Sequence, residues 1–190
     1  MVMLSKKICL IGDFAVGKTS LIRCFVERQF SDHYLSTVGV KISLKTLELP
    51  GLSQQQSQNL QLMIWDLEGQ TKFKAIAPTY LQGANGALVV ADVTRQESIA
   101  RIPEHIQLFL SVNPKGLLVV ALNKSDLIDE EKLAKISSNY HLKEQEQVLA
   151  TYSTSAKTGA YVDEIFQKLA HNIIQSGMNP LYNKPSSHAK

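Results

Sequence analysis

The sequence predicts a three-layer α/β domain in which helices cover both faces of a mostly parallel β-sheet. Short runs of Val, Ile and Leu, as in residues 86–93 and 116–122, are typical of strands buried on both faces. Longer segments of helical periodicity lie between these runs, as parallel strands require. With 190 residues, 44% of them hydrophobic, we expect one domain over residues 1–177 and a flexible tail over 178–190.

The first part of the chain predicts a strand, a helix and a β-hairpin. The strand spans residues 7–11, and the helix runs from residue 18 to about 29. The hairpin arms are residues 38–49 and 60–65. Residues 50–59 between them are polar and begin with Pro-Gly, so we expect a mobile surface loop there.

The second part predicts alternating strands and helices. The expected strands are residues 86–93, 116–122 and 147–152. The expected helices are residues 97–112, 129–140 and 162–176. Pro103 lies inside the first of these helices, so we expect either a kink or a late start there.

Composition excludes several classes of protein. Twenty Lys and Arg are scattered among 17 Asp and Glu, so we expect no nucleic-acid partner. Cys9 and Cys24 lie in apolar segments without metal-ligand spacing, which favours small buried side chains over a disulfide or a zinc site. The N-terminal apolar run is too short for a signal peptide or a membrane span, and we expect a cytoplasmic protein.

Residues 12–19 fit the pattern G-x-x-x-x-G-K-[ST] between a predicted strand and a predicted helix. Backbone N–H groups of such a loop surround phosphate, Lys18 reaches the β- and γ-phosphates, and the Thr19 hydroxyl coordinates Mg²⁺. A glycine-rich turn without a ligand is the alternative, and the strand-loop-helix context disfavours it. The predicted nucleotide-binding residues here are Gly12, Ala15, Val16, Gly17, Lys18, Thr19 and Ser20.

Two further segments predict which nucleotide base the site binds. Residues 123–126, Asn-Lys-Ser-Asp, directly follow an apolar strand. Asp126 can accept hydrogen bonds from N1–H and the 2-amino group of guanine, which adenine lacks, and such a site can discriminate by roughly 10⁴-fold. Asn123 would steady this loop and face the edge of the base, and the stem of Lys124 would cover the ring. The backbone N–H groups of residues 155–157, which are Ser155, Ala156 and Lys157, would meet the guanine O6 at the same rim.

Groups that sense the γ-phosphate are expected between these loops. Asp66, at the end of a predicted strand, can hold Mg²⁺ through water, and the Thr37 hydroxyl can complete its octahedron. Gly69 offers an N–H that can approach the phosphate without a side chain. Gln70 can orient the attacking water, so Gln70, Lys18 and Thr37 are the predicted catalytic residues.

From about residue 6 to 176, the chain resembles the Ras superfamily, and within it the Rab branch. The matching segments are residues 12–20, 30–39 (first switch), 65–70 (second switch), 123–126 and 155–157. Phe30 lies twelve positions after Lys18, and Thr37 nineteen, as in that family. The resemblance implies a P-loop NTPase fold of six strands in the order 2-3-1-4-5-6, one of them antiparallel, with about five helices.

The resemblance also implies roles and partners. Phe30 would lie edge-on to guanine, Tyr34 near the phosphates, and Thr37 on Mg²⁺ in the GTP state. The implied cofactors are GTP or GDP and Mg²⁺. The implied partners are a nucleotide-exchange factor, a GTPase-activating protein and an effector that contact residues 31–42 and 66–80 of a monomer. Of the aromatic triad that Rabs show to effectors, Trp65 and Tyr80 are present and Ile42 stands at the third position, although core packing explains such aromatics equally well.

Departures from the family bear on hydrolysis and anchoring. Phe14 replaces a small residue, and a bulky ring there could obstruct Gln70 or an incoming arginine. Glu68 replaces the usual alanine and adds a negative charge beside Mg²⁺ and phosphate. No arginine in the first switch is placed to act in cis, so we expect slow hydrolysis helped by a partner. A hydrolysis-deficient nucleotide-binding scaffold is the alternative, and residues 123–126 disfavour an ATP-dependent kinase.

The last residues predict no direct lipid anchor. The sequence ends Pro-Ser-Ser-His-Ala-Lys, without the terminal cysteines that carry prenyl groups in Rabs. Val2 follows Met1, whereas myristoylation requires glycine at that place. Any membrane role would therefore run through a protein partner.

Overall fold

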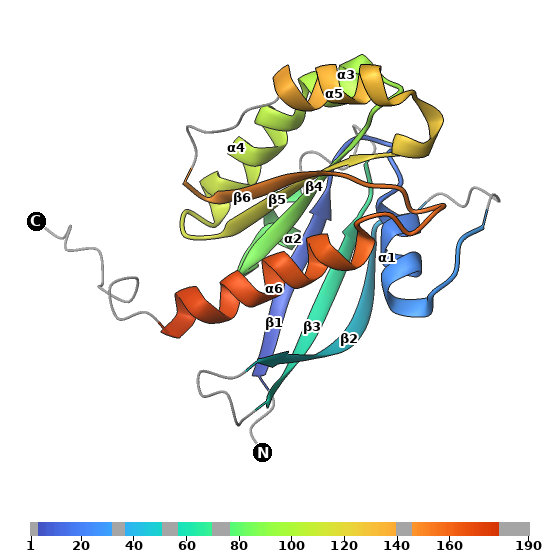
Figure 1. Cartoon of the computed structure of the whole chain (residues 1–190). Helices are drawn as coiled ribbons and strands as arrows, with labels where there is room; N and C mark the ends of the chain where they lie inside the picture. The colour runs from blue at the N-terminus through green and yellow to red at the C-terminus, as the bar shows by residue number, and fades with distance from the viewer. Residues whose placement is uncertain (1–3, 32–36, 51–56, 70–76, 140–145, 179–190) are drawn as a thin grey trace, which may run out of the picture.

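A computed structural model describes residues 4–31, 37–50, 57–69, 77–139 and 146–178. Six strands form one sheet in the order β2-β3-β1-β4-β5-β6 (Figure 1). β2 pairs with β3 in the antiparallel direction, and the other neighbouring pairs are parallel. The predicted fold class and strand order are therefore confirmed.

Every expected strand is present. The strands are β1 (Leu4–Ile11), β2 (Val40–Pro50), β3 (Ser57–Leu67), β4 (Gly86–Asp92), β5 (Leu117–Asn123) and β6 (Val148–Ser153). β3 is longer at both ends than the predicted arm 60–65, because its pairing with β2 continues from Val40↔Leu67 to Pro50↔Ser57. Backbone hydrogen bonds of a hairpin need no apolar side chains, so the polar residues at its far end were not predicted as strand.

The helices follow the predicted pattern with two additions. They are α1 (Lys18–Glu27), α2 (Ala77–Leu81), α3 (Gln96–Ala100), α4 (Ile102–Val112), α5 (Glu130–Asn139) and α6 (Val162–Met178), with a 3₁₀ turn η2 (Ser125–Leu127). The helix predicted at 97–112 is divided at Arg101, and Pro103 lies in the first turn of α4, where its missing N–H breaks no hydrogen bond. α2 and η2 are too short to show a periodicity.

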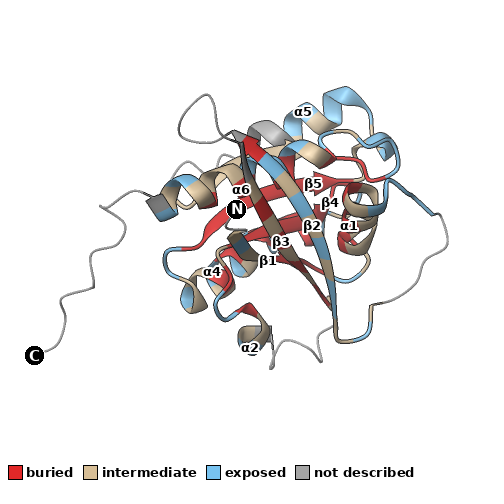
Figure 2. Cartoon of the chain, turned by 90° about the horizontal axis from the view of Figure 1, so that it is seen from below, coloured by how far each residue is buried: buried red, intermediate tan, exposed pale blue. Residues whose placement is uncertain are grey.

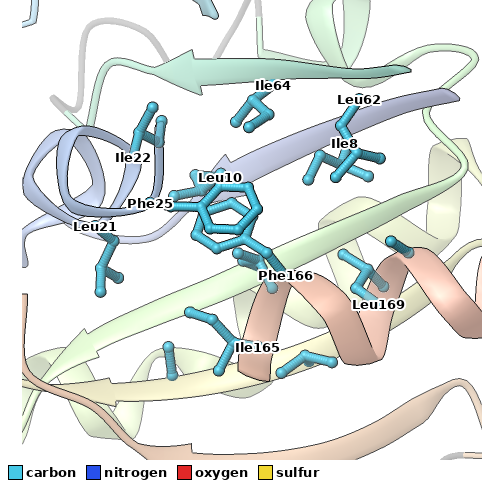
Figure 3. Close-up of a cluster of buried hydrophobic side chains, with 14 of the residues drawn as sticks. Ile8, Leu10, Leu21, Ile22, Phe25, Leu62, Ile64, Ile165, Phe166 and Leu169 are labelled. Carbon is cyan, nitrogen blue, oxygen red and sulfur yellow. The ribbon is translucent and has the colours of Figure 1, made fainter. Parts of the chain in front are cut away.

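Two apolar cores, one on each face of the sheet, hold the layers together. α1 and α6 cover one face, where the rings of Phe25 and Phe166 stack with centroids 4.0 Å apart (Figure 3). Side chains of α2, α3 and α4, such as Leu81, Ile99 and Phe109, pack on the opposite face. β4 and β5 are buried along their whole length, whereas residues 40–48 of β2, at the edge, are half-buried or exposed (Figure 2).

Other expectations from composition have mixed outcomes. Cys9 is buried as predicted, and burial raises the pKa of its thiol to about 12. Cys24 is only half-buried. Among the helices that the structure describes, none has the length and apolarity needed to cross a bilayer. Apart from Met178, the predicted tail 178–190 lies outside the described residues, as do residues 51–56 of the hairpin loop.

Candidate functional site

The loop between β1 and α1 surrounds the amino group of Lys18. The Lys18 Nζ donates hydrogen bonds to the main-chain oxygens of Gly12 and Asp13, at 2.9 and 2.7 Å. Gly12 has a φ angle of 145°, and a Cβ added there would lie 2.1 Å from the carbonyl oxygen of Val90. The start of this loop therefore requires glycine both for its conformation and for its contact with β4.

The charge on Lys18 is poorly solvated. Burial lowers the pKa of Lys18 to about 8, although the carboxylates of Asp66 and Asp13 oppose this shift. The positive charge of Arg95 lowers the pKa of Lys18 further. A phosphate group beside Nζ would stabilise the charged form, so this amine is suited to bind an anion.

The three residues predicted to hold Mg²⁺ lie together. The Thr19 hydroxyl donates to Asp66 Oδ2 at 2.5 Å, and the Thr37 hydroxyl lies 2.8 Å from that of Thr19 and 3.3 Å from the same carboxylate oxygen. The other carboxylate oxygen, Oδ1, is buried and has no hydrogen-bond partner within the described ranges. Burial raises the pKa of Asp66, while the two hydroxyls and Lys18 oppose that rise. Hard oxygen donors around an unsatisfied carboxylate oxygen fit Mg²⁺.

No cluster of three His, Cys, Asp or Glu side chains that could hold a metal occurs in the described part of the chain. A magnesium ion here would thus depend on two hydroxyls, one carboxylate, water and ligand phosphates. That donor set is usual for Mg²⁺, which keeps several waters and binds through few protein ligands.

Asn123 connects the three predicted loops. Its Nδ2 donates to the main-chain oxygen of Val16 at 2.9 Å, and its Oδ1 accepts from the Thr154 hydroxyl and the Ala156 amide, each at 3.3 Å. The residue is 1% exposed. A Cβ added to Gly17 would lie 2.3 Å from Asn123 Nδ2. The phosphate loop and both base loops are therefore held in one arrangement by a buried amide.

A cavity of about 260 Å³ lies where these loops meet. Its lining includes the predicted phosphate-loop residues Ala15, Gly17, Thr19 and Ser20, and the predicted base residues Phe30, Asn123, Lys124, Asp126, Ala156 and Lys157. Arg23 and Leu127 also line it and were not predicted. Residues from distant parts of the sequence thus converge on one cavity, as expected for the carboxyl end of an α/β sheet.

Ser155 acts on this cavity through Asp126. The buried Ser155 hydroxyl donates to Asp126 Oδ1 at 2.5 Å and accepts from the Thr158 amide at 3.1 Å. The Ser155 amide donates to the carbonyl oxygen of Ala160 at 3.1 Å, so that amide is already engaged. The structure thus gives Ser155 a role in orienting the carboxylate, which the sequence did not suggest.

Asp92 is a site residue that the sequence reasoning missed. Its Oδ2 lies 2.6 Å from Lys124 Nζ, and its Oδ1 accepts from the amide and hydroxyl of Thr94. Burial by itself raises the pKa of this carboxyl, but the hydrogen bonds from Lys124 and Thr94 outweigh it and hold the pKa below its usual value. Its place directly after the apolar run of β4 was the available signal.

The side of the site that is predicted to receive the γ-phosphate is narrow. Phe14, Lys18, Thr37 and Gly69 line a cavity of about 40 Å³ beside the first one. Phe14 is 39% exposed. Tyr34 and Gln70, which were predicted to contact phosphate and water, lie outside the described residues.

Glu68 contacts the first switch. Its Oε2 accepts a hydrogen bond from the Gly39 amide at 2.8 Å, and its own amide donates to the Gly39 carbonyl oxygen at 3.0 Å. Gly39 has a φ angle of 72°, which favours glycine. The carboxylate that was expected to act on Mg²⁺ and phosphate is therefore bonded to the backbone where the first switch joins β2.

Trp65 and Tyr80 are both core and surface residues. Their rings lie 6.5 Å apart, both pack against the apolar core as half-buried side chains, and Lys7 Nζ lies 3.8 Å from the Trp65 ring centroid. Ile42, the register partner of Trp65 across the hairpin, is 52% exposed. The two explanations weighed from the sequence, core packing and presentation to a partner, are thus compatible.

Comparison with known proteins agrees with this geometry. The model of the Ras family matches residues 7–175. Ras-related protein RABF2b of Arabidopsis thaliana is 35% identical over 93% of this chain and 86% of its own length. Ras-related protein Rab-1C of Dictyostelium discoideum is 35% identical, with coverage of 90% and 81%. GTP-binding protein ypt5 of Schizosaccharomyces pombe is 34% identical, with coverage of 90% and 79%.

The strand order and the glycine-rich loop between β1 and α1 define an α/β protein of the P-loop GTPase class. The chain belongs to the Ras family and is a Rab-like member of it.

Proposed function

We propose that this chain is a molecular switch that binds GTP and GDP with Mg²⁺ and hydrolyses GTP slowly. The observation that carries the proposal is the convergence of the phosphate loop and the two base loops on one cavity through Asn123. Family membership supports the same activity, because Ras and Rab proteins are GTPases.

Each part of the nucleotide has a matching group. Lys18 and the loop amides bind the phosphates, and Asp126 accepts from N1–H and the 2-amino group of guanine. Phe30 and the stem of Lys124, which Asp92 holds, contact the ring. Thr19 and Thr37 supply hydroxyl ligands for Mg²⁺, and Asp66 contacts it through water. When bound, Mg²⁺ would supply positive charge that stabilises the negative charge of the phosphates.

Hydrolysis depends on groups around the γ-phosphate. Gln70 orients the attacking water, and Gly69 donates its amide to the phosphate. The first switch, residues 30–39, supplies no arginine that could act in cis, so intrinsic turnover is slow and a partner supplies the missing charge. Such help is worth about 10³ to 10⁵ in rate. Exchange factors, activating proteins and effectors contact residues 31–42 and 66–80 of a monomer.

Base selection is tested by Asp126→Asn. Asparagine keeps one acceptor for N1–H but presents an amine toward the 2-amino group of guanine, so GDP affinity should fall by roughly 10²-fold or more. Xanthosine diphosphate carries a carbonyl at that position and should bind the variant better than GDP does. Asp163→Asn is the matched control, because Asp163 pairs with Arg28 at the surface. Unchanged GDP affinity in Asp126→Asn would contradict the proposed base site.

A hydrolysis-deficient nucleotide-binding scaffold is the second candidate. Phe14 favours it, because the residue lines the small cavity together with Lys18 and Gly69 and occupies space beside the phosphate. Single-turnover hydrolysis by wild type, Phe14→Gly and Gln70→Leu separates the two. A switch predicts slow hydrolysis that Gln70→Leu abolishes. Equal and negligible rates in wild type and Phe14→Gly, with or without candidate activators, would establish the scaffold.

A further inference from the structure

Three basic side chains from residues 95–105 hold two adjacent residues of the phosphate loop. Arg95, just before α3, donates from Nη1 to the Phe14 carbonyl oxygen at 2.8 Å. Arg101, between α3 and α4, donates to Asp13 Oδ2 at 3.3 Å, and His105 Nε2 lies 3.2 Å from Asp13 Oδ1. All three contacts join segments more than 80 positions apart in the sequence.

Asp13 adds a buried negative charge to the loop that is proposed to receive phosphate. Its side chain is 8% exposed, and its carbonyl oxygen accepts from Lys18 Nζ at 2.7 Å. Arg101 and His105 bond one carboxylate oxygen each, so both oxygens are satisfied by α3–α4 rather than by the site. The pair keeps this carboxylate turned toward the helices, while the main chain of Asp13 supports the lysine.

Two hydrogen bonds orient the guanidinium group of Arg95. Its Nε donates to Glu97 Oε1 at 3.1 Å, while Nη1 reaches the phosphate loop. Its positive charge is close enough to lower the pKa of Lys18. A guanidinium fixed in this way holds the Phe14 carbonyl in one direction, because its fork geometry loses little freedom on bonding.

Gly69 of the second switch lies against the peptide that joins Asp13 to Phe14. A Cβ added to Gly69 would lie 2.6 Å from the carbonyl carbon and oxygen of Asp13 and from the amide nitrogen of Phe14. Gly69 thus lies against the Asp13–Phe14 peptide, while the basic side chains hold the two groups that flank this peptide in the chain, the Asp13 carboxylate and the Phe14 carbonyl. The orientation of this peptide determines the positions of the Phe14 ring and of Gly69. Both residues line the small cavity, together with Thr37 and Lys18.

We propose that Asp13 and Arg95 are positioning residues for GTP hydrolysis: together with Arg101 and His105, they fix the Asp13–Phe14 peptide and thereby place Phe14 and Gly69 beside the γ-phosphate. This inference rests on the proposed function. The peptide borders the γ-phosphate side and not the base cavity, so its displacement affects GTP more than GDP. A small misplacement at a reacting centre can lower a rate by orders of magnitude.

The test compares wild type with Arg95→Gln, Arg95→Lys and Asp13→Asn. Dissociation constants are measured for GDP and for guanosine β,γ-imidotriphosphate, and GTP hydrolysis is followed in single turnover. Arg95→Gln and Asp13→Asn should slow hydrolysis and weaken imidotriphosphate binding by about tenfold each, with less than about threefold change for GDP. Arg95→Lys keeps a donor for the Phe14 carbonyl and should recover part of the loss.

Arg28→Gln is the matched control, because Arg28 forms a surface ion pair with Asp163 and should leave all three values unchanged. Thermal unfolding checks that each variant is folded. If Asp13→Asn does not fold, the result for Arg95→Gln alone tests the proposal. Unchanged values, or equal losses for GDP and imidotriphosphate, would overturn the proposal. If wild type does not hydrolyse GTP, the proposal is tested by the ratio of the affinities for imidotriphosphate and GDP in each variant. Failure of wild type to bind GDP would instead remove the proposed function, and this proposal with it.

Discussion

Burial of Lys18 links nucleotide binding to pH at the scale of single residues. Its amino group is enclosed by the loop carbonyls of Gly12 and Asp13, and burial lowers its pKa to about 8. Phosphate oxygens beside Nζ would raise that pKa again, since an opposite charge favours the charged form. Binding should therefore take up a proton wherever the free amine is partly neutral.

We expect GDP affinity to be nearly constant below pH 7.5 and to fall as the pH rises through 8, by at most tenfold per unit. Affinity falls with rising pH because the pKa of Lys18 is higher in the nucleotide-bound state than in the free state. Calorimetry at pH 8 in two buffers of different ionisation enthalpy measures the proton uptake directly. Proton release, or no uptake at pH 8, would contradict the assignment to Lys18.

Glu68 gives a second prediction at this scale. Its carboxylate accepts from the Gly39 amide, so Glu68→Ala leaves that amide without its partner and should lower the free energy of unfolding by about 1 kcal/mol. Glu68→Gln retains an acceptor oxygen and should lose less. Urea denaturation of the three proteins measures the difference. Equal stability of Glu68→Ala and wild type would show that this hydrogen bond contributes nothing.

At the scale of elements, α6 supports α1, which begins with the predicted nucleotide-binding residues Lys18 and Thr19. Phe25 of α1 stacks on Phe166 of α6 with an interplanar angle of 5°, deep in the core (Figure 3). Lys18 and Thr19 begin the same helix, so the stack holds the element that positions them.

We predict that Phe166→Ala destabilises the protein by about 3 to 5 kcal/mol, from lost burial and the cavity left behind. Phe166→Leu fills more of the space and should cost clearly less. Denaturant unfolding with a constant m-value measures both. A loss below about 1 kcal/mol in Phe166→Ala would contradict the view that this stack holds α1 in place.

Elements with a continuous or periodic apolar pattern could be predicted from the sequence, and short or contact-dependent ones could not. β4 and β5 are buried along their whole length and apolar up to their last residue, because helices cover both faces, and this made them recognisable. α2 and η2 are shorter than two helical turns and carry no period. The break before α4 was expected from Pro103, since proline fits a first helical turn but not an interior.

The site shows the same division. Gly17 and Asp126 could be placed on one cavity because each lies in a loop that follows a recognisable strand. The partners of Asp13, Lys124 and Glu68 could not, because those hydrogen bonds join segments whose approach depends on the packed structure. Sequence motifs identify groups that contact a ligand, whereas the groups that orient them become visible only in the fold.

At the scale of the whole molecule, the site joins loops from most of the sheet. Loops after β1, β3, β5 and β6 meet through Asn123, Asp66 and Lys18, so a ligand bound there contacts several elements at once. A ligand that binds only the folded state stabilises the whole fold by mass action.

We therefore expect GDP with Mg²⁺ at about 100 times its dissociation constant to raise the free energy of unfolding by about 2.7 kcal/mol. Removing Mg²⁺ with EDTA should weaken GDP binding and reverse part of this gain, because Thr19 and Asp66 then lose the ion that joins them to the phosphates. Thermal unfolding with GDP, with ADP and with EDTA measures these effects. An equal shift with ADP would contradict guanine selectivity.

The central claim is that the site holds a guanine nucleotide and turns it over. Purified protein is loaded with a mixture of GTP and ATP in Mg²⁺, freed of unbound nucleotide and denatured at successive times, and the released nucleotide is identified by chromatography. The account predicts guanine nucleotide alone, with GTP converted slowly to GDP. Release of adenine nucleotide, or of no nucleotide, would contradict it.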